Sequence, residues 1–140
     1  MADENKGIYL LIIMLKRDKK IKIGALGTIN FKEGFYYYIG SAQNNLQNRI
    51  ERHSRSDKKF HWHIDYFLNV SIIIDYYTLL AGKRFECKLF NYLKENDRMQ
   101  MPVIGFGSSD CKCPAHFLCS KRLVNIKELI NKFKDQYLKS

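Results

Sequence analysis

The stretch IYLLIIML at residues 8–15 is the longest apolar run in the chain. Its β-branched and leucine-rich composition is typical of a strand that is buried on both faces. A second run, FYYYI at residues 35–39, predicts an aromatic strand. Between the two runs, residues 18–20 are typical of a turn, and residues 21–23 alternate as a partner strand does. We therefore expect residues 8–39 to form an antiparallel meander.

The rest of the chain carries one further strand and several helical patterns. The isoleucine-rich residues 71–80 predict the strand. Helices are expected at residues 46–55, 62–68, 83–94 and 121–138. The last helix is amphipathic, because its apolar residues recur at helical spacing. Its apolar stripe consists of Leu123, Ile126, Ile130, Phe133 and Tyr137.

The fold class follows from this mixture of elements. Residues 101–120 show no clear period, and we expect them to form an irregular loop that contains cysteine and histidine. We find no linker, repeat or low-complexity segment, so residues 1–140 are expected to form one domain. The pattern predicts an α+β fold with a small central, mainly antiparallel β-sheet flanked by helices.

The charge balance favours a polyanionic partner. The 140 residues include 24 Lys and Arg against 14 Asp and Glu, a formal charge of +10. Nucleic acid is the first expectation and an anionic membrane surface the second, while a solvated basic surface is the plain alternative. No apolar run approaches the roughly 20 residues that span a bilayer. Asp3 and Glu4 argue against a secretory signal, so we expect a cytoplasmic protein with no membrane partner.

Two tripeptides carry the clearest functional signal. GIY at residues 7–9 opens the first predicted strand, and YIG at residues 38–40 closes the aromatic one. A predicted helix with Arg49 and His53 on one face follows, and a later helix carries Glu86. This order of residues resembles the GIY-YIG nuclease superfamily.

The resemblance covers residues 7–95 and extends to a prokaryotic branch found alone or fused to an endonuclease III-like glycosylase. The stretches similar to that branch are YIGSA at 38–42, HWHIDY at 61–66 and GFGSSDC at 105–111. The resemblance implies a metal-dependent endonuclease that hydrolyses phosphodiester bonds in DNA, in DNA repair or processing, with a DNA-repair protein as a further partner. The alternatives are a non-catalytic nucleic-acid-binding module of the same fold and a protein-interaction domain clipped by zinc.

The resemblance implies catalytic roles for Tyr9, Tyr38, Arg49, His53 and Glu86, and the chemistry of hydrolysis asks for the same residue types. Glu86 can hold one Mg²⁺ or Mn²⁺ ion and leave water positions free. Arg49 can grip a phosphate with a bidentate fork. Tyr9 is the expected general base, Tyr38 orients the water or the phosphate, and His53 assists proton transfer.

Each of these residues also has a structural interpretation. Tyr9 and Tyr38 can be core packing, Arg49 and His53 can be surface residues, and Glu86 can be an exposed partner of a lysine. The order of the residues favours the joint catalytic interpretation. Contacts to the nucleic-acid backbone, DNA first with RNA left open, are expected from Arg52, Arg55, Lys58, Lys59 and His63.

The chain departs from the superfamily by an extra ribbon around residues 24–27, between the two motifs. The match then requires that the strands of Tyr9 and Tyr38 still lie side by side. A second cluster holds Trp62, His63 and Asp65. We expect Trp62 to anchor the segment. The role of His63 stays open between pairing with Asp65 and an approach to the phosphate.

A third cluster gathers thiols and an imidazole within a few residues. These are suitable zinc ligands, and a bound zinc ion would stabilise an irregular loop. Cysteines that pack as small apolar side chains are the competing interpretation. Zn²⁺ is therefore a further candidate cofactor beside Mg²⁺ or Mn²⁺. Its candidate ligands are Cys111, Cys113, His116 and Cys119.

Overall fold

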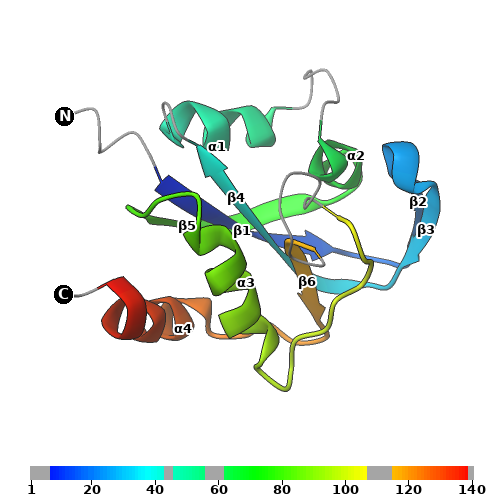
Figure 1. The fold of residues 1–140 in the computed structure, drawn as a ribbon. Helices are drawn as coiled ribbons and strands as arrows, with labels where there is room; N and C mark the ends of the chain where they lie inside the picture. The colour runs from blue at the N-terminus through cyan, green and yellow to red at the C-terminus, as the bar shows by residue number, and fades with distance from the viewer. Residues whose placement is uncertain (1–6, 43–45, 56–61, 107–114, 139–140) are drawn as a thin grey trace.

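A four-stranded antiparallel sheet forms the centre of the protein (Figure 1). The computed structural model describes residues 7–42, 46–55, 62–106 and 115–138. The strands, in order across the sheet, are β5 (Ile72–Leu79), β1 (Gly7–Leu15), β4 (Gly34–Ala42) and β6 (Phe117–Ser120). Helices flank this sheet, which confirms the predicted α+β class.

Two helices cover each face of the sheet. α1 (Leu46–Ser54) and α2 (His63–Leu68) lie above it in Figure 1, and α3 (Phe85–Lys94) and α4 (Ile126–Phe133) lie below it. Alternate residues of β1 enter the core on each side, so the continuous apolar run serves both layers. None of the helices in the described ranges is long and apolar enough to cross a membrane.

The ribbon between β1 and β4 forms its own small sheet. β2 (Lys19–Lys22) pairs with β3 (Thr28–Phe31) around a 3₁₀ turn at Gly24–Leu26, so residues 19 and 20 are strand and not turn. The meander prediction is wrong, because β1 pairs with β4 and not with β2. In β2 only Ile21 is buried. A strand placed beside β1 in the sheet would need apolar residues on both faces, and β2 lacks them. The ribbon folds away and leaves β1 and β4 side by side, as the resemblance requires.

The C-terminal third differs from expectation at two places. Part of the predicted irregular loop forms β6, which pairs with β4; four residues are too short a run to show a period. The predicted last helix begins at Ile126 and not at residue 121, because the Asn125 side chain caps it by accepting the Glu128 amide at 3.2 Å. Leu123 therefore lies outside the helix and is 52% exposed. A π-helical turn at Lys134–Leu138 follows α4.

The register of β1 and β4 places Gly40 opposite Tyr9. A Cβ atom built on Gly40 would lie 2.4 Å from both Cζ and Oη of Tyr9. The Tyr9 ring therefore lies across the neighbouring strand at a position that has no side chain. Glycine is required there by this close approach and not by its backbone angles.

Gly40→Ala should lower the free energy of unfolding by about 1–3 kcal/mol, because the new methyl group overlaps a buried ring whose surroundings are packed. Urea unfolding followed by circular dichroism measures the change. Gly82→Ala is the matched control, since a Cβ there meets no described atom within 4 Å. Equal stabilities of the two variants would contradict the close approach of Tyr9 to Gly40.

Candidate active site

Tyr9 and His53 meet beneath α1. The Tyr9 hydroxyl lies 2.7 Å from Nε2 of His53, and each residue is only 2% exposed. β1 directs Tyr9 toward α1, and the buried face of α1 holds Leu46, Ile50 and His53. The apolar stripe that docks this helix therefore also brings His53 to the tyrosine. His53 is therefore not the surface residue that its structural interpretation assumed.

Tyr38 lies in the same aromatic cluster. Its ring centroid is 6.3 Å from that of Tyr9 and 6.0 Å from that of His53. Burial raises the pKa of Tyr9 above its ordinary value, and the charge of the neighbouring Arg49 opposes the rise. Burial, and then the neighbouring Tyr9, also hold the pKa of Tyr38 well above its ordinary value. Both hydroxyls are therefore protonated at neutral pH.

Arg49 reaches from α1 to the end of β4. Its Nη1 donates a hydrogen bond to the carbonyl oxygen of Ser41 at 3.1 Å. Its guanidinium carbon also lies 4.5 Å from the centroid of the Trp62 ring, and that of Arg52 lies 4.3 Å from the same ring. Trp62, at the start of α2, thus packs against two arginines of α1.

Asp65 connects α1 and α2. It is fully buried and accepts two hydrogen bonds from Arg52, at 3.0 and 3.1 Å. It also accepts the backbone amide of Trp62 at 2.8 Å, and its Oδ1 lies 4.0 Å from Nδ1 of His53. The helix N-terminal position of Asp65, three residues after Trp62, is the sequence signal for this cap.

Two residues expected to contact nucleic acid therefore have other contacts. Arg52, predicted to touch the nucleic-acid backbone, binds Asp65 and Trp62. His63 packs against Phe106 at a ring distance of 5.7 Å, and burial lowers its pKa. Arg55 is exposed at the end of α1. Lys58 and Lys59 lie outside the described residues.

Glu86 approaches the tyrosines from α3. It lies in the first turn of that helix and is 5% exposed, which contradicts the interpretation as an exposed lysine partner. Its negative charge contributes to the raised pKa of both Tyr9 and Tyr38. Its Oε2 lies 3.2 Å from Nδ1 of His116. The structure thus gathers Tyr9, Tyr38, Arg49 and His53 from β1, β4 and α1, and the charge of Glu86 on α3 acts on the same two tyrosines.

The candidate zinc ligands do not come together in the described part of the chain. His116 contacts Glu86 on the α3 side of the sheet, whereas Cys119 packs into the core on the α1 side. Cys111 and Cys113 lie outside the described residues. Within the described ranges, no group of three or more His, Cys, Asp or Glu side chains is arranged to hold a metal ion. A zinc site that uses both His116 and Cys119 does not fit this arrangement.

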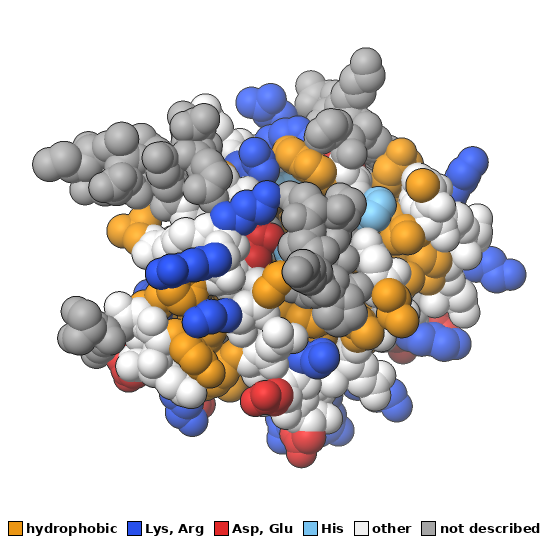
Figure 2. Space-filling view, viewed as in Figure 1, with side chains coloured by type: hydrophobic (Ala, Val, Ile, Leu, Met, Phe, Trp, Pro, Cys, Tyr) orange, Lys and Arg blue, Asp and Glu red, His pale blue; other side chains and the backbone are white. Residues whose placement is uncertain are grey.

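Basic side chains surround the candidate site. Figure 2 shows Lys and Arg side chains gathered on one face, from the region of α1 down to α3. The exposed basic residues of these two helices and of the turn before α3 are Arg55, Lys83, Arg84, Lys88 and Lys94. The two helices that supply Arg49, His53 and Glu86 therefore also carry positive charge at the surface.

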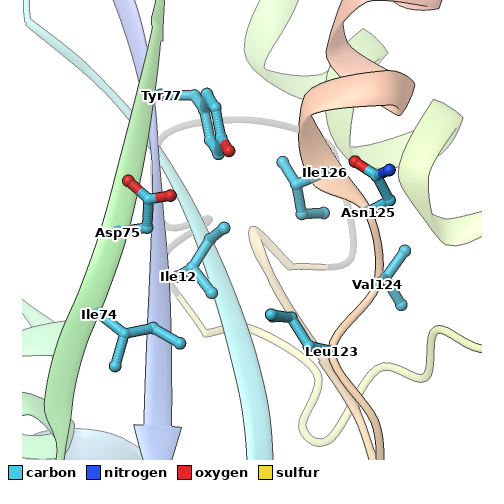
Figure 3. Close-up of a pocket in the computed structure, with 8 residues that line it drawn as sticks. All are labelled: Ile12, Ile74, Asp75, Tyr77, Leu123, Val124, Asn125 and Ile126. Carbon is cyan, nitrogen blue, oxygen red and sulfur yellow. The ribbon is translucent and has the colours of Figure 1, made fainter.

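A separate pocket of about 420 Å³ lies away from these residues. Figure 3 shows it between β5 and the segment that leads into α4. None of the five predicted catalytic residues contributes to its lining. The lining residues are Ile12, Ile74, Asp75, Tyr77, Leu123, Val124, Asn125 and Ile126.

The comparisons with known proteins place the chain in a family. Residues 8–138 match the model of the family described as domain of unknown function DUF123. The protein therefore belongs to this family. No curated protein and no solved structure matches the chain. The description of this family assigns no activity.

Asp65→Asn should lower the free energy of unfolding by about 3 kcal/mol, because it leaves the guanidinium of Arg52 without its buried counter-charge. Chemical denaturation at pH 7 measures the loss. Glu51→Gln, an exposed change on the facing helix α1, should stay within about 0.5 kcal/mol of the parent protein. A loss for Asp65→Asn as small as that of the control would contradict the proposed role of the buried carboxylate.

The raised pKa of Tyr9 predicts a pH dependence of stability. The unfolded chain loses the Tyr9 proton near pH 10, whereas the folded protein keeps it to higher pH. The stability that Tyr9 contributes is therefore fully present below pH 10 and is lost as the pH rises above 10. The stability difference between the parent and Tyr9→Phe should be constant from pH 7 to 9. Above pH 10, the free energy of unfolding of the parent should fall relative to that of Tyr9→Phe by about 1.4 kcal/mol per pH unit. Urea unfolding across this range tests the expectation, and a constant difference up to pH 11 would contradict it.

Proposed function

We propose that this protein is a metal-dependent endonuclease that hydrolyses phosphodiester bonds in DNA. The observation that carries the proposal is the convergence of Tyr9, Tyr38, Arg49, His53 and Glu86 from four separate elements. Buried polar groups are costly, and a cluster of them that also perturbs pKa values is typical of a catalytic site. The basic surface of α1 and α3 supports a polyanionic substrate.

Glu86 is the residue that would hold the divalent cation. One carboxylate oxygen faces His116, and Oε1 has no hydrogen-bond or ion-pair partner among the described residues. A single carboxylate suits Mg²⁺ or Mn²⁺, because these ions keep several water ligands. A cation bound there supplies positive charge to the phosphate and lowers the pKa of a water molecule.

Tyr9 and His53 would carry the proton of the attacking water. A protonated phenol cannot accept a proton until it gives up its own. Nε2 of His53, 2.7 Å from the Tyr9 hydroxyl, is positioned to receive that proton. Asp65, near the opposite ring nitrogen, favours the imidazole tautomer that leaves Nε2 as an acceptor. The pair therefore acts as a relay from water to tyrosine to histidine.

Arg49 and Tyr38 would bind the phosphate. The charge of Arg49 lowers the pKa of Tyr9, so its guanidinium is close to the group that meets the water. Its contact with the Ser41 carbonyl holds the side chain at the end of β4. Tyr38 stays protonated and donates a hydrogen bond to a phosphate oxygen or to the water.

The resemblance to the GIY-YIG nuclease superfamily is part of this proposal. It extends to a role in DNA repair or processing in the cytoplasm, with a repair protein as a partner. A non-catalytic nucleic-acid-binding module is the second candidate. The burial of Tyr9, Tyr38, His53 and Glu86, each at most 6% exposed, is the observation that favours it, because a substrate needs access to reacting groups.

The test of the nuclease is Glu86→Gln, which keeps the shape of the side chain and removes the charge that attracts a cation. Cleavage of end-labelled linear, flapped and branched DNA with Mg²⁺ or Mn²⁺ should fall by at least about 100-fold. DNA binding in EDTA should not weaken, because Glu86 contributes no positive charge. Denaturing gels measure cleavage, and fluorescence anisotropy measures binding.

Glu95→Gln provides the matched control, since Glu95 is exposed at the other end of α3. It should cleave as the parent does. Metal-dependent cleavage that persists in Glu86→Gln would overturn the assignment of the cation ligand. Salt-sensitive binding without any product from the parent protein would favour the non-catalytic module.

A further inference from the structure

His116 and Glu86 form a buried pair next to the candidate active site. Nδ1 of His116 lies 3.2 Å from Oε2 of Glu86. His116 is 1% exposed and Glu86 is 5% exposed, so little water reaches either group. A buried carboxylate is costly unless a hydrogen-bond donor or a counter-charge meets it. His116 supplies that donor from a segment far from Glu86 in the sequence.

The main chain holds His116 in place. Its amide donates to the carbonyl oxygen of Phe106 at 2.8 Å, and its carbonyl oxygen accepts the amide of Ile39 at 3.0 Å. Ile39 belongs to the YIG tripeptide of β4, so His116 extends the ladder between β4 and β6. The imidazole is therefore tied to the strand that carries Tyr38 and Gly40.

Both ring nitrogens of His116 face α3. Nδ1 points to Glu86, and Nε2 lies 3.6 Å from the sulfur of Cys87. Since a carboxylate only accepts hydrogen bonds, Nδ1 carries the hydrogen in this pair. The ring also lies 6.3 Å from that of Phe90, one turn further along α3. These contacts define the orientation of the ring toward the first turn of the helix.

We propose that His116 is a positioning residue that aims the cation-binding carboxylate of Glu86. A free glutamate side chain has several rotatable bonds, and a donor at one oxygen restricts them. With Oε2 held by His116, Oε1 is the oxygen presented to a cation. Groups that hold a metal ligand in this way commonly change metal affinity by about 10- to 100-fold. This inference rests on the proposed function, because it takes Glu86 as the ligand.

The hydrogen on Nδ1 of His116 is what holds Oε2 of Glu86. Asparagine can place its amide nitrogen near the position of Nδ1, and glutamine places it nearer that of Nε2. The two substitutions therefore separate the donor at Nδ1 from the mere filling of the site.

The experiment measures Mn²⁺ binding to the full chain by electron paramagnetic resonance, in the absence of DNA. The variants are His116→Ala, His116→Asn, His116→Gln and Glu86→Gln. We expect His116→Ala and His116→Gln to weaken Mn²⁺ binding by about 10- to 100-fold. His116→Asn should stay close to the parent, and Glu86→Gln should lose the site. Circular dichroism tests whether each variant is folded. If His116→Ala does not fold, the comparison of His116→Asn with His116→Gln decides whether the donor at Nδ1 matters.

The outcomes separate this inference from the proposed function. Mn²⁺ binding that is unchanged in Glu86→Gln would overturn the cation site itself. A site lost in Glu86→Gln but intact in His116→Ala or His116→Gln would overturn the role of His116 and leave the nuclease proposal standing. Equal weakening in His116→Asn and His116→Gln would also overturn it, because the donor at Nδ1 would then make no difference.

Discussion

The antiparallel pairing of β1 with β4, with Gly40 opposite Tyr9, is the constraint on which the candidate site depends. A side chain at residue 40 would occupy the space of the Tyr9 ring, so this register is tied to a glycine. The same stretch of β4 provides the Ser41 carbonyl for Arg49 and the Ile39 amide for His116. A slip of one residue would turn Tyr9 to the opposite face and separate it from α1.

The site is built from polar groups that compensate one another within a closely packed interior. Tyr9 meets His53, His53 lies near Asp65, and Asp65 binds Arg52, which covers Trp62. Each contact offsets part of the cost of removing a polar group from water. Glu86 joins from the other layer of the fold with His116 as its donor.

The strong apolar patterns predicted local structure well. The runs at 8–15 and 35–39 form β1 and β4, and the predicted helices at 46–55 and 83–94 correspond to α1 and α3 within a few residues. Short or capped elements were less predictable. β6 has only four residues and exists because β4 offers a free edge. The start of α4 depends on the Asn125 cap, which ends the apparent periodicity of Leu123.

By itself, the sequence determined the α+β class, the order of Tyr9, Tyr38, Arg49, His53 and Glu86, and the helical spacing that places Arg49 and His53 together. Periodicity and spacing are local, so they act before the chain is folded. Only the tertiary structure decided that β1 pairs with β4 and not with the ribbon of β2 and β3, that Arg52 binds Asp65, and that His116 meets Glu86. These choices depend on which surfaces can bury one another across long separations, and no single segment contains that information.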